Sequence, residues 1–178
     1  MAKKIPIFLA CSDLHLSVAP PPVRAEEPDW FEAQGRVLDQ IKEVALNYEV
    51  NDVFFAGDWF DKAKVSPALE CWTIRKIKEL GLSWNVVAGQ HDLPGHRLDF
   101  LNESSLGVVL AACHDSHVPG SGTMELLSRN GLFFANGDMV GLSWENEWVE
   151  TECPVESLVL HKLLWQKDPP FPGAPESG

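Results

Sequence analysis

Three apolar runs in the first half of the chain predict buried strands. They cover residues 5–11, 53–56 and 84–88. Short apolar runs bounded by turn-forming residues are typical of strands that are covered on both faces of a sheet. The segments between these runs are longer, and their apolar residues recur every three or four positions, which is the pattern of a helix with one buried side.

Residue types at the ends of these two segments indicate where each helix begins and stops. The first helix is expected to begin after Asp29, a good N-cap residue, and to run to about Tyr48. The second has Ser66 as N-cap, Pro67 in its first turn and Gly81 as its C-terminal stop. Strands that alternate with helices predict a right-handed parallel βαβαβ unit, which we interpret as a doubly wound half-domain.

The pattern changes beyond residue 92. The apolar runs become short and are separated by Gly or Asn turns, which predicts a mainly antiparallel second sheet. The expected elements are a loop with a short helix over 93–106 and strands over 108–112, 123–127, 132–135, 138–144 and 158–160. The fold class is therefore α/β, with two mixed sheets flanked by helices. Residues 1–165 are expected to form one domain, and the Pro- and Gly-rich residues 166–178 an unstructured tail.

Charge and cysteine content narrow the class of protein. A formal net charge of −12 argues against a surface that attracts nucleic acid phosphates everywhere. It does not exclude a nucleic acid substrate, because bound divalent cations would reverse the sign inside a cleft. The four cysteines are widely spaced and form no CxxC pair, which favours reduced thiols in the cytoplasm.

The N-terminal residues superficially imitate a lipoprotein signal. We interpret them as the first strand instead, because the apolar run contains Pro6 and leads directly into Asp13 and His15. No apolar run approaches the roughly 20 residues of a membrane span, so no membrane association is expected.

Metal-capable side chains follow the ends of four predicted strands. They are Asp13 and His15, then Asp58, then Gln90 with His91 and Asp92, and finally His161. Taken singly, such residues are usually turn formers or polar surface groups. Because ligands bind where the strands of an open α/β sheet end, their succession predicts a metal site at that edge.

These residues resemble the signature of the calcineurin-like metallophosphoesterases. That signature reads D-x-H, G-D-x-x-D, G-N-H-D or G-N-H-E, a lone His after a strand, and G-H-x-H. Residues 13–15, 57–61 and 89–92 match the first three motifs in order, and His161 matches the fourth. The resemblance implies an αββα sandwich and hydrolysis of phosphoesters with two divalent metal ions.

The resemblance also implies a role for each residue. Asp13 and His15 would hold the first metal, Asp58 would bridge the two, and Gln90 and His161 would hold the second. His91 would protonate the leaving oxygen or stabilise charge, with Asp92 fixing its orientation, and Asp61 would brace the site. Carboxylate and imidazole ligands suit manganese, with iron or zinc as alternatives, and such metals lower the pKa of a bridging water so that hydroxide is available.

Two departures from the signature stand out. Gln90 replaces the usual asparagine and extends the side chain by one methylene, so that it ligates with shifted geometry or not at all. The fifth motif, G-H-x-H, is absent. We therefore expect either an N-terminal fragment, truncated at its C-terminal end, or a degenerate family member.

A narrower resemblance suggests the substrate. Residues 12–16, and 57–61 followed by Ser66 and Pro67, are most similar to the nuclease subunits of double-strand-break repair complexes and their phage relatives. This implies phosphodiester hydrolysis in DNA, an ATPase partner subunit and a homodimer. The alternatives are a phosphomonoesterase or cyclic-nucleotide phosphodiesterase, and a catalytically incomplete scaffold that docks to a partner; retention of His91 with Asp92 opposes the scaffold.

Two further features receive a structural interpretation. The Cys-His-Asp-Ser-His sequence at 113–117 could bind zinc, but no second cluster completes a tetrahedral site, so we interpret it as a loop. Trp59 follows Asp58 directly and could line a cleft, yet a place in the core is the default expectation for tryptophan.

Overall fold

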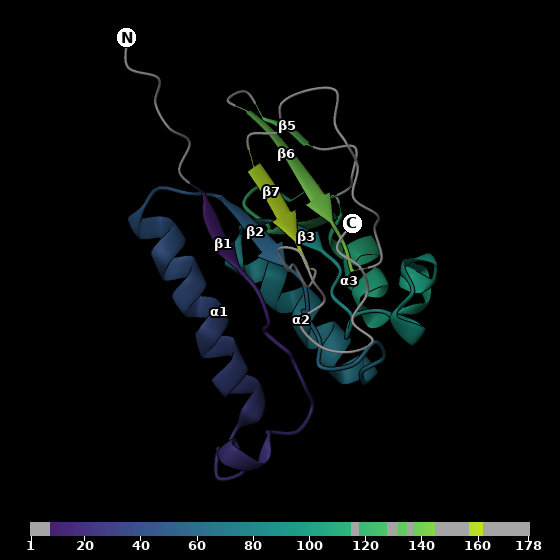
Figure 1. Cartoon of the computed structure of the whole chain (residues 1–178). Coiled ribbons are helices and arrows are strands. Elements are labelled where there is room, and N and C mark those ends of the chain that lie inside the picture. Colours follow the sequence, from purple (N-terminus) through teal and green to yellow (C-terminus); the bar gives the residue numbers. More distant parts are fainter. Residues whose placement is uncertain (1–7, 115–117, 128–131, 135–136, 145–156, 162–178) are drawn as a thin grey trace, which may run out of the picture.

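The computed structural model describes residues 8–114, 118–127, 132–134, 137–144 and 157–161 (Figure 1). Up to residue 87, its α-helices and strands follow the predicted order. The elements are β1 (Leu9–Cys11), α1 (Trp30–Asn47), β2 (Asp52–Ala56), α2 (Pro67–Leu80), β3 (Ser83–Val87), α3 (Ser105–Cys113), β4 (Thr123–Leu126), β5 (Leu132–Phe134), β6 (Gly137–Leu142) and β7 (Ser157–Leu160). Short 3-10 helices cover Pro22–Arg24, Pro94–His96 and Leu98–Glu103.

The two predicted helices and their caps are confirmed. The Asp29 side chain accepts a hydrogen bond from the backbone N–H of Glu32 at 2.9 Å, and Ser66 does the same for Leu69 at 3.3 Å. Gly81 ends α2 in the left-handed conformation, with φ of 71°. Among the described residues, no helix is long and apolar enough to cross a membrane.

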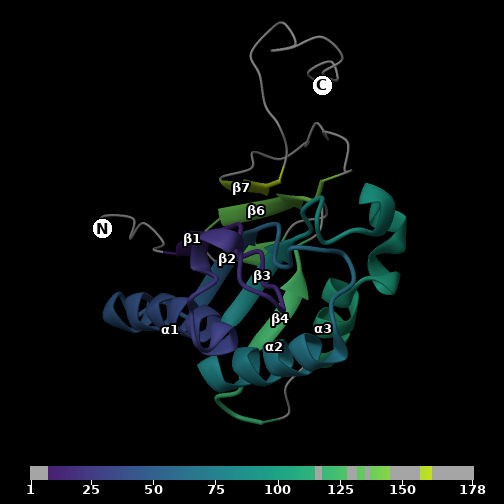
Figure 2. The same cartoon turned by 90° about the horizontal axis from the view of Figure 1, so that it is seen from below.

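The first sheet has the strand order β1-β2-β3-β4, and all its pairings are parallel. Each connection between consecutive strands therefore leads to the next position in the sheet, always toward the same edge. Right-handed crossovers that always step the same way place their helices on one face of a sheet. Figure 2 shows α1, α2 and α3 together below that sheet, which confirms the predicted parallel βαβαβ unit, the arrangement of one half of a doubly wound fold.

Strand β4 belongs to the first sheet, whereas the sequence predicts it in the second. Residues 123–127 were assigned to the second sheet, but β4 pairs in parallel with β3. The second sheet has the order β5-β6-β7, in which β5 and β6 are antiparallel and β6 and β7 are parallel. It is therefore mixed rather than mainly antiparallel.

The segment predicted as a strand over 108–112 is part of helix α3. Ser104 caps this helix by accepting a hydrogen bond from Gly107 at 3.0 Å. The buried residues Leu106, Val109 and Cys113 recur at helical spacing on one side, while Val108 is 45% exposed. The apolar run has no polar residue that would mark a period, so its sequence alone does not separate a helix from a strand.

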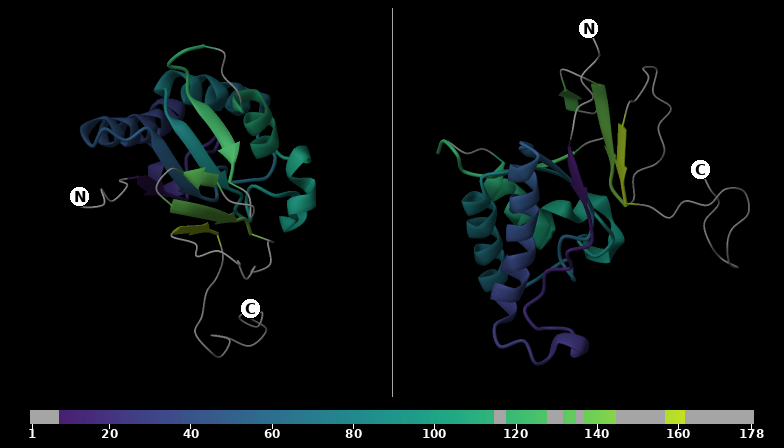
Figure 3. Two further views of the ribbon diagram at one scale, coloured as in Figure 1. Left: turned by 90° about the horizontal axis from the view of Figure 1, so that it is seen from above. Right: turned by 90° about the vertical axis from the view of Figure 1, so that its left-hand side faces the viewer.

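The second sheet covers the face of the first sheet that lies opposite the helices (Figure 3, right). Neighbouring residues of β2 show the alternation: Phe55 packs into the large core under the helices, whereas Phe54 packs with Val87, Leu127 and Val159 in a smaller core. The described residues thus form three layers, one of helices and two of sheets. The predicted domain boundary at residue 165 and the tail lie outside the described residues.

Candidate metal centre

The loops after β1 and β2 continue the pairing of the two strands and carry three of the predicted ligands. The N–H of Asp13 donates to the carbonyl of Gly57 at 3.0 Å, and the N–H of His15 donates to the carbonyl of Asp58 at 3.1 Å. Asp13, His15 and Asp58 all have positive φ, at 57°, 45° and 58°. Left-handed backbone at non-glycine residues is strained, and such residues cluster at functional sites.

Asp58 lies at the centre of the site, and its side chain is only 3% exposed. Its Oδ1 atom accepts a hydrogen bond from the N–H of His91 at 3.0 Å. Its Oδ2 atom lies 3.8 Å from Nε2 of His15 and 3.4 Å from Nε2 of His161. Within the described ranges no lysine or arginine forms an ion pair with Asp58. Because a buried carboxylate is costly without a compensating cation, this position suits a metal ion.

His161 and Gln90 approach Asp58 from the other side. The Nδ1 atom of His161 lies 2.7 Å from the carbonyl oxygen of Ala56, which identifies Nδ1 as the protonated nitrogen. The Nε2 atom then remains as an acceptor, and it lies 2.8 Å from Oε1 of Gln90. With Oδ2 of Asp58, three acceptor atoms converge on one point. A cation bound between the three atoms, a second proton on the ring, or a Gln90 amide turned to present its N–H to Nε2 would satisfy that arrangement.

His91 lies on the His15 side of the site. The two imidazole rings have their centroids 5.0 Å apart, and ligand atoms of His15, Asp58 and His91 all lie within 4.8 Å of one another. His91 was expected to act on substrate, and the geometry places it within ligand range as well. Asp13 is the most open of the group: its side chain is 55% exposed and lies 3.6 Å from Nε2 of His15.

Asp92 does not make the contact expected of it. Its carboxylate is fully buried and accepts backbone hydrogen bonds from Trp59 at 3.2 Å, Phe60 at 2.9 Å and Gly89 at 3.0 Å. Burial raises its pKa, against the lowering effect of those three N–H groups. Asp92 therefore ties the turn after β3 to the loop that carries Asp58, instead of orienting the His91 ring.

The ring of His91 is held by a backbone group instead. Its Nδ1 atom lies 3.2 Å from the carbonyl oxygen of Asp61. The expectation that Asp61 braces the site is thus met through its main chain. Backbone carbonyls that orient histidines, here of Ala56 and Asp61, leave no mark in a sequence because every residue has one.

Two glycines of the motifs are required by space. A Cβ atom at Gly57 would overlap the imidazole of His161, and one at Gly89 would overlap the carboxylate and backbone nitrogen of Asp58. Any side chain at these positions would push a predicted ligand out of place. The Gly-Asp and Gly-Gln-His-Asp sequences therefore need glycine for close packing around the site.

Sequence reasoning missed Trp144 as a neighbour of the site. Its ring centroid lies 6.0 Å from that of His161, and its backbone N–H donates to the carbonyl of Ala88 at 2.9 Å. This bond attaches the end of the second sheet to the end of β3. The burial of Trp59, expected from packing, is confirmed: it is fully buried against Phe55 and Trp84.

The remaining histidines divide between structure and surface. His96 faces the carbonyl oxygen of Gln90 through Nδ1 at 2.9 Å and so braces the turn that carries Gln90. In the Cys-His-Asp-Ser-His sequence, Cys113 is buried in α3 and His114 is exposed. Residues 115–117 lie outside the described ranges.

The donor set of the site is oxygen and imidazole nitrogen, which fits manganese, iron or zinc. A family model described as calcineurin-like phosphoesterase matches residues 7–174 of the chain. A comparison with curated proteins gives no match.

Proposed function

Because the chain belongs to the calcineurin-like phosphoesterases, a family of metal-dependent phosphoester hydrolases, we propose that it hydrolyses phosphodiester bonds of nucleic acid with two divalent metal ions. One observation carries the proposal: Asp58, Gln90 and His161 present three acceptor atoms to one point, beside the cluster of His15, Asp58 and His91. One carboxylate thus stands between two groups of ligands.

The residues fall into two sets that share Asp58. Asp13, His15 and Asp58 would hold one ion, and Asp58, Gln90 and His161 the other. When bound, such ions neutralise phosphate charge and activate water as Lewis acids, and we propose manganese as the metal, with iron or zinc as alternatives.

His91 is the residue that we assign to proton transfer. Its Nδ1 atom is directed at the carbonyl oxygen of Asp61, which leaves Nε2 to hold the proton that the leaving oxygen requires. Asp92 is a positioning residue, since it acts on the Asp58 loop through the backbone of Trp59 and Phe60.

The choice of nucleic acid rests on motif similarity to nuclease subunits of break-repair complexes. On the same basis we propose a cytoplasmic enzyme that works with an ATPase partner and forms a homodimer. The competing function is that of a phosphomonoesterase, whose substrate is a phosphate with one ester bond instead of two.

The test is hydrolysis of bis(p-nitrophenyl) phosphate and of p-nitrophenyl phosphate with added manganese. We compare the parent chain with Asp58→Asn. The matched control is Asp99→Asn, which makes the same chemical change at a side chain that is 75% exposed. Loss of the bridging carboxylate should abolish both bound manganese and diester hydrolysis, and the control should keep both.

Each result has a defined meaning. Diester hydrolysis that exceeds monoester hydrolysis and disappears in Asp58→Asn supports the proposal. A preference for the monoester would make the chain a phosphomonoesterase. Equal activity of the parent and Asp58→Asn would remove Asp58 from the mechanism. Absence of both activity and bound manganese would leave the scaffold interpretation.

A further inference from the structure

A groove of about 700 Å³ opens beside His15, between residues 14–22 and segment 61–66. From it we infer that the protein binds a single-stranded segment of nucleic acid next to the scissile phosphodiester. We call this feature the lysine groove, because Lys62 and Lys64 lie in its lining. The inference rests on the proposed function, which it extends by naming the form of nucleic acid and the residues that hold it.

The lysine groove adjoins the candidate metal centre directly. His15 and Asp61 belong to its lining. The same two residues flank His91, whose ring lies 5.0 Å from that of His15 and whose Nδ1 atom faces the Asp61 carbonyl. A chain molecule with one phosphodiester at the metal centre can therefore continue into the groove.

One wall of the groove is held in place by hydrogen bonds within the protein. Ser17 donates its backbone N–H to Oε1 of Gln34 at 2.7 Å, and Nε2 of Gln34 donates back to the carbonyl of Ser17 at 3.1 Å. Trp30 donates its indole N–H to the Ser17 hydroxyl at 3.1 Å. These bonds fasten the loop 14–22 to the start of α1, so the wall is held in place without a ligand.

The charges of the groove suit phosphate groups. Lys62 and Lys64 are both exposed, and neither forms an ion pair with another residue in the part of the chain that the structure describes. Asp61 also lines the groove, so the two lysines set two positive charges against one carboxylate, in a chain whose formal net charge is −12. Lysine binds phosphate as a point charge, without the fixed geometry that a forked contact needs.

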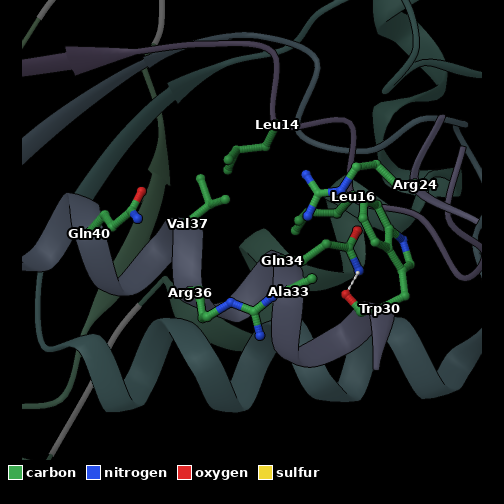
Figure 4. A pocket seen from close by; sticks show the side chains of 9 residues that line it. All are labelled: Leu14, Leu16, Arg24, Trp30, Ala33, Gln34, Arg36, Val37 and Gln40. Carbon is green, nitrogen blue, oxygen red and sulfur yellow. Dashed lines mark hydrogen bonds between the residues drawn. The ribbon is translucent and has the colours of Figure 1, made fainter. Parts of the chain in front are cut away.

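The neighbouring pocket is different. It has a volume of about 280 Å³ and lies against α1, with Arg24, Arg36 and Trp30 in its lining (Figure 4). Both arginines are already paired with Glu27, at 2.9 Å and 2.7 Å. The two lysines are therefore the better partners for phosphate groups. Leu14, Leu16 and Trp30 line both spaces and form the boundary between them.

Size and lining favour one strand over two. A space of about 700 Å³ has the dimensions of a pocket for a small ligand and cannot enclose a duplex. Residues 20–22 are prolines, and with Trp30 and Val65 they give the groove apolar lining in addition to its two lysines. Positive charge for the backbone combined with an apolar or aromatic surface for the bases is the general design of single-strand binding sites.

The test measures binding of a fluorescent oligothymidylate by anisotropy, with calcium as the divalent ion, at a series of salt concentrations. The variant Lys62→Gln with Lys64→Gln removes both groove charges. The control, Lys42→Gln with Lys78→Gln, removes the same charge from α1 and α2. We expect the groove variant to bind about 25-fold more weakly near 0.1 M salt, with a salt slope smaller by about 1.4, since each single-strand phosphate contact contributes about 0.7.

Small-substrate hydrolysis separates this inference from the proposed function. Bis(p-nitrophenyl) phosphate has no further phosphate to occupy the groove, so its hydrolysis by the parent chain tests the metal centre without the groove. If the parent hydrolyses no diester, but binds oligothymidylate and the groove variant binds it more weakly, the proposed function fails and the inference about the groove is supported.

Several outcomes would overturn the inference. Two concern the variants: the groove variant binds oligothymidylate as tightly as the parent, or the control variant loses as much binding as the groove variant. Two concern the ligand: the parent binds blunt duplex or polyglutamate more tightly than oligothymidylate, or it binds none of the three. An abasic oligonucleotide of the same charge should bind more weakly than oligothymidylate, because it offers no base to the apolar lining of the groove.

Discussion

The Nε2 atom of His161 lies 2.8 Å from the Oε1 atom of Gln90, although the two residues are 71 positions apart in the chain. The extra methylene of glutamine thus does not keep its amide oxygen away from the centre. Gln90 reaches the side of Asp58 that faces His161, where the family signature has asparagine.

The first prediction concerns Gln90. Gln90→Ala removes one of the three converging acceptors, so manganese affinity should fall about 10- to 100-fold, the usual effect of losing a supporting group at a metal site. Isothermal titration of metal-free protein with manganese measures this. Gln40→Ala, on the exposed side of α1, is the control and should titrate like the parent. Unchanged affinity in Gln90→Ala would show that Gln90 holds no metal.

A second prediction separates backbone strain from crowding at Gly57. Gly57 and Gly120 both have left-handed backbone, with φ of 90° and 78°. An added Cβ would overlap the His161 ring at Gly57, whereas nothing lies within 4 Å at Gly120. Gly120→Ala should therefore lower the free energy of unfolding by only the left-handed cost of about 1–2 kcal/mol. Gly57→Ala should lower it further.

Urea unfolding compares the two alanine variants, and manganese titration adds a second measure. Gly57→Ala should also lose manganese affinity because the proposed ligand His161 is displaced, while Gly120→Ala should retain it. Equal unfolding free energies with intact manganese binding in both variants would mean that His161 has room to move.

A third prediction follows from Asp52 at the start of β2. Burial raises the pKa of its carboxyl group above the ordinary value. The folded state therefore favours the protonated form, and the stability that this form contributes is lost as pH rises through the raised pKa. Compared with Asp52→Asn, the parent should lose unfolding free energy between about pH 4 and pH 7, the range above the ordinary aspartate pKa.

Denaturant unfolding at both pH values, in the presence of a chelator, measures this shift. Asp99→Asn reports what removal of one surface carboxylate does, because that side chain is 75% exposed. A parent that gains stability relative to Asp52→Asn as pH rises would contradict the prediction.

A fourth prediction ranks the thiols by reactivity. Burial raises the pKa of Cys11 to about 11, and it also raises the pKa of Cys113, whereas Cys71 is exposed on α2. Only the thiolate is nucleophilic. Of the three thiols in the described residues, iodoacetamide at pH 8 should therefore label Cys71 first, and peptide mass spectrometry should find Cys11 and Cys113 labelled at least about tenfold more slowly. Equal labelling of all three in the folded protein would contradict this order.

The part of the fold that sequence could predict is the part encoded by strand ends. Apolar runs ending before Asp13, Asp58 and Gln90 indicated three strands, and parallel pairing of those strands brings their ends together. Caps at Asp29 and Ser66 fixed the helices between them, because capping acts within one turn of the chain.

The rest depended on contacts that sequence does not record. The apolar run in α3 has the same composition whether it forms a helix or a strand, and only burial of Leu106, Val109 and Cys113 separates the two. The sequence of β4 suits a strand of either sheet, so it does not predict that β4 pairs with β3. The role of Asp92 was missed because its partners are backbone N–H groups.

The left-handed backbone of Asp13, His15 and Asp58 has a consequence for the evolution of the chain. Each such residue costs about 1–3 kcal/mol that the surrounding structure must offset. Glycine at any of the three would remove the steric strain and would also remove a ligand. Directed evolution for thermal stability alone would therefore erase this centre early, and a screen must include manganese binding as a second readout if the improved variants are to keep it.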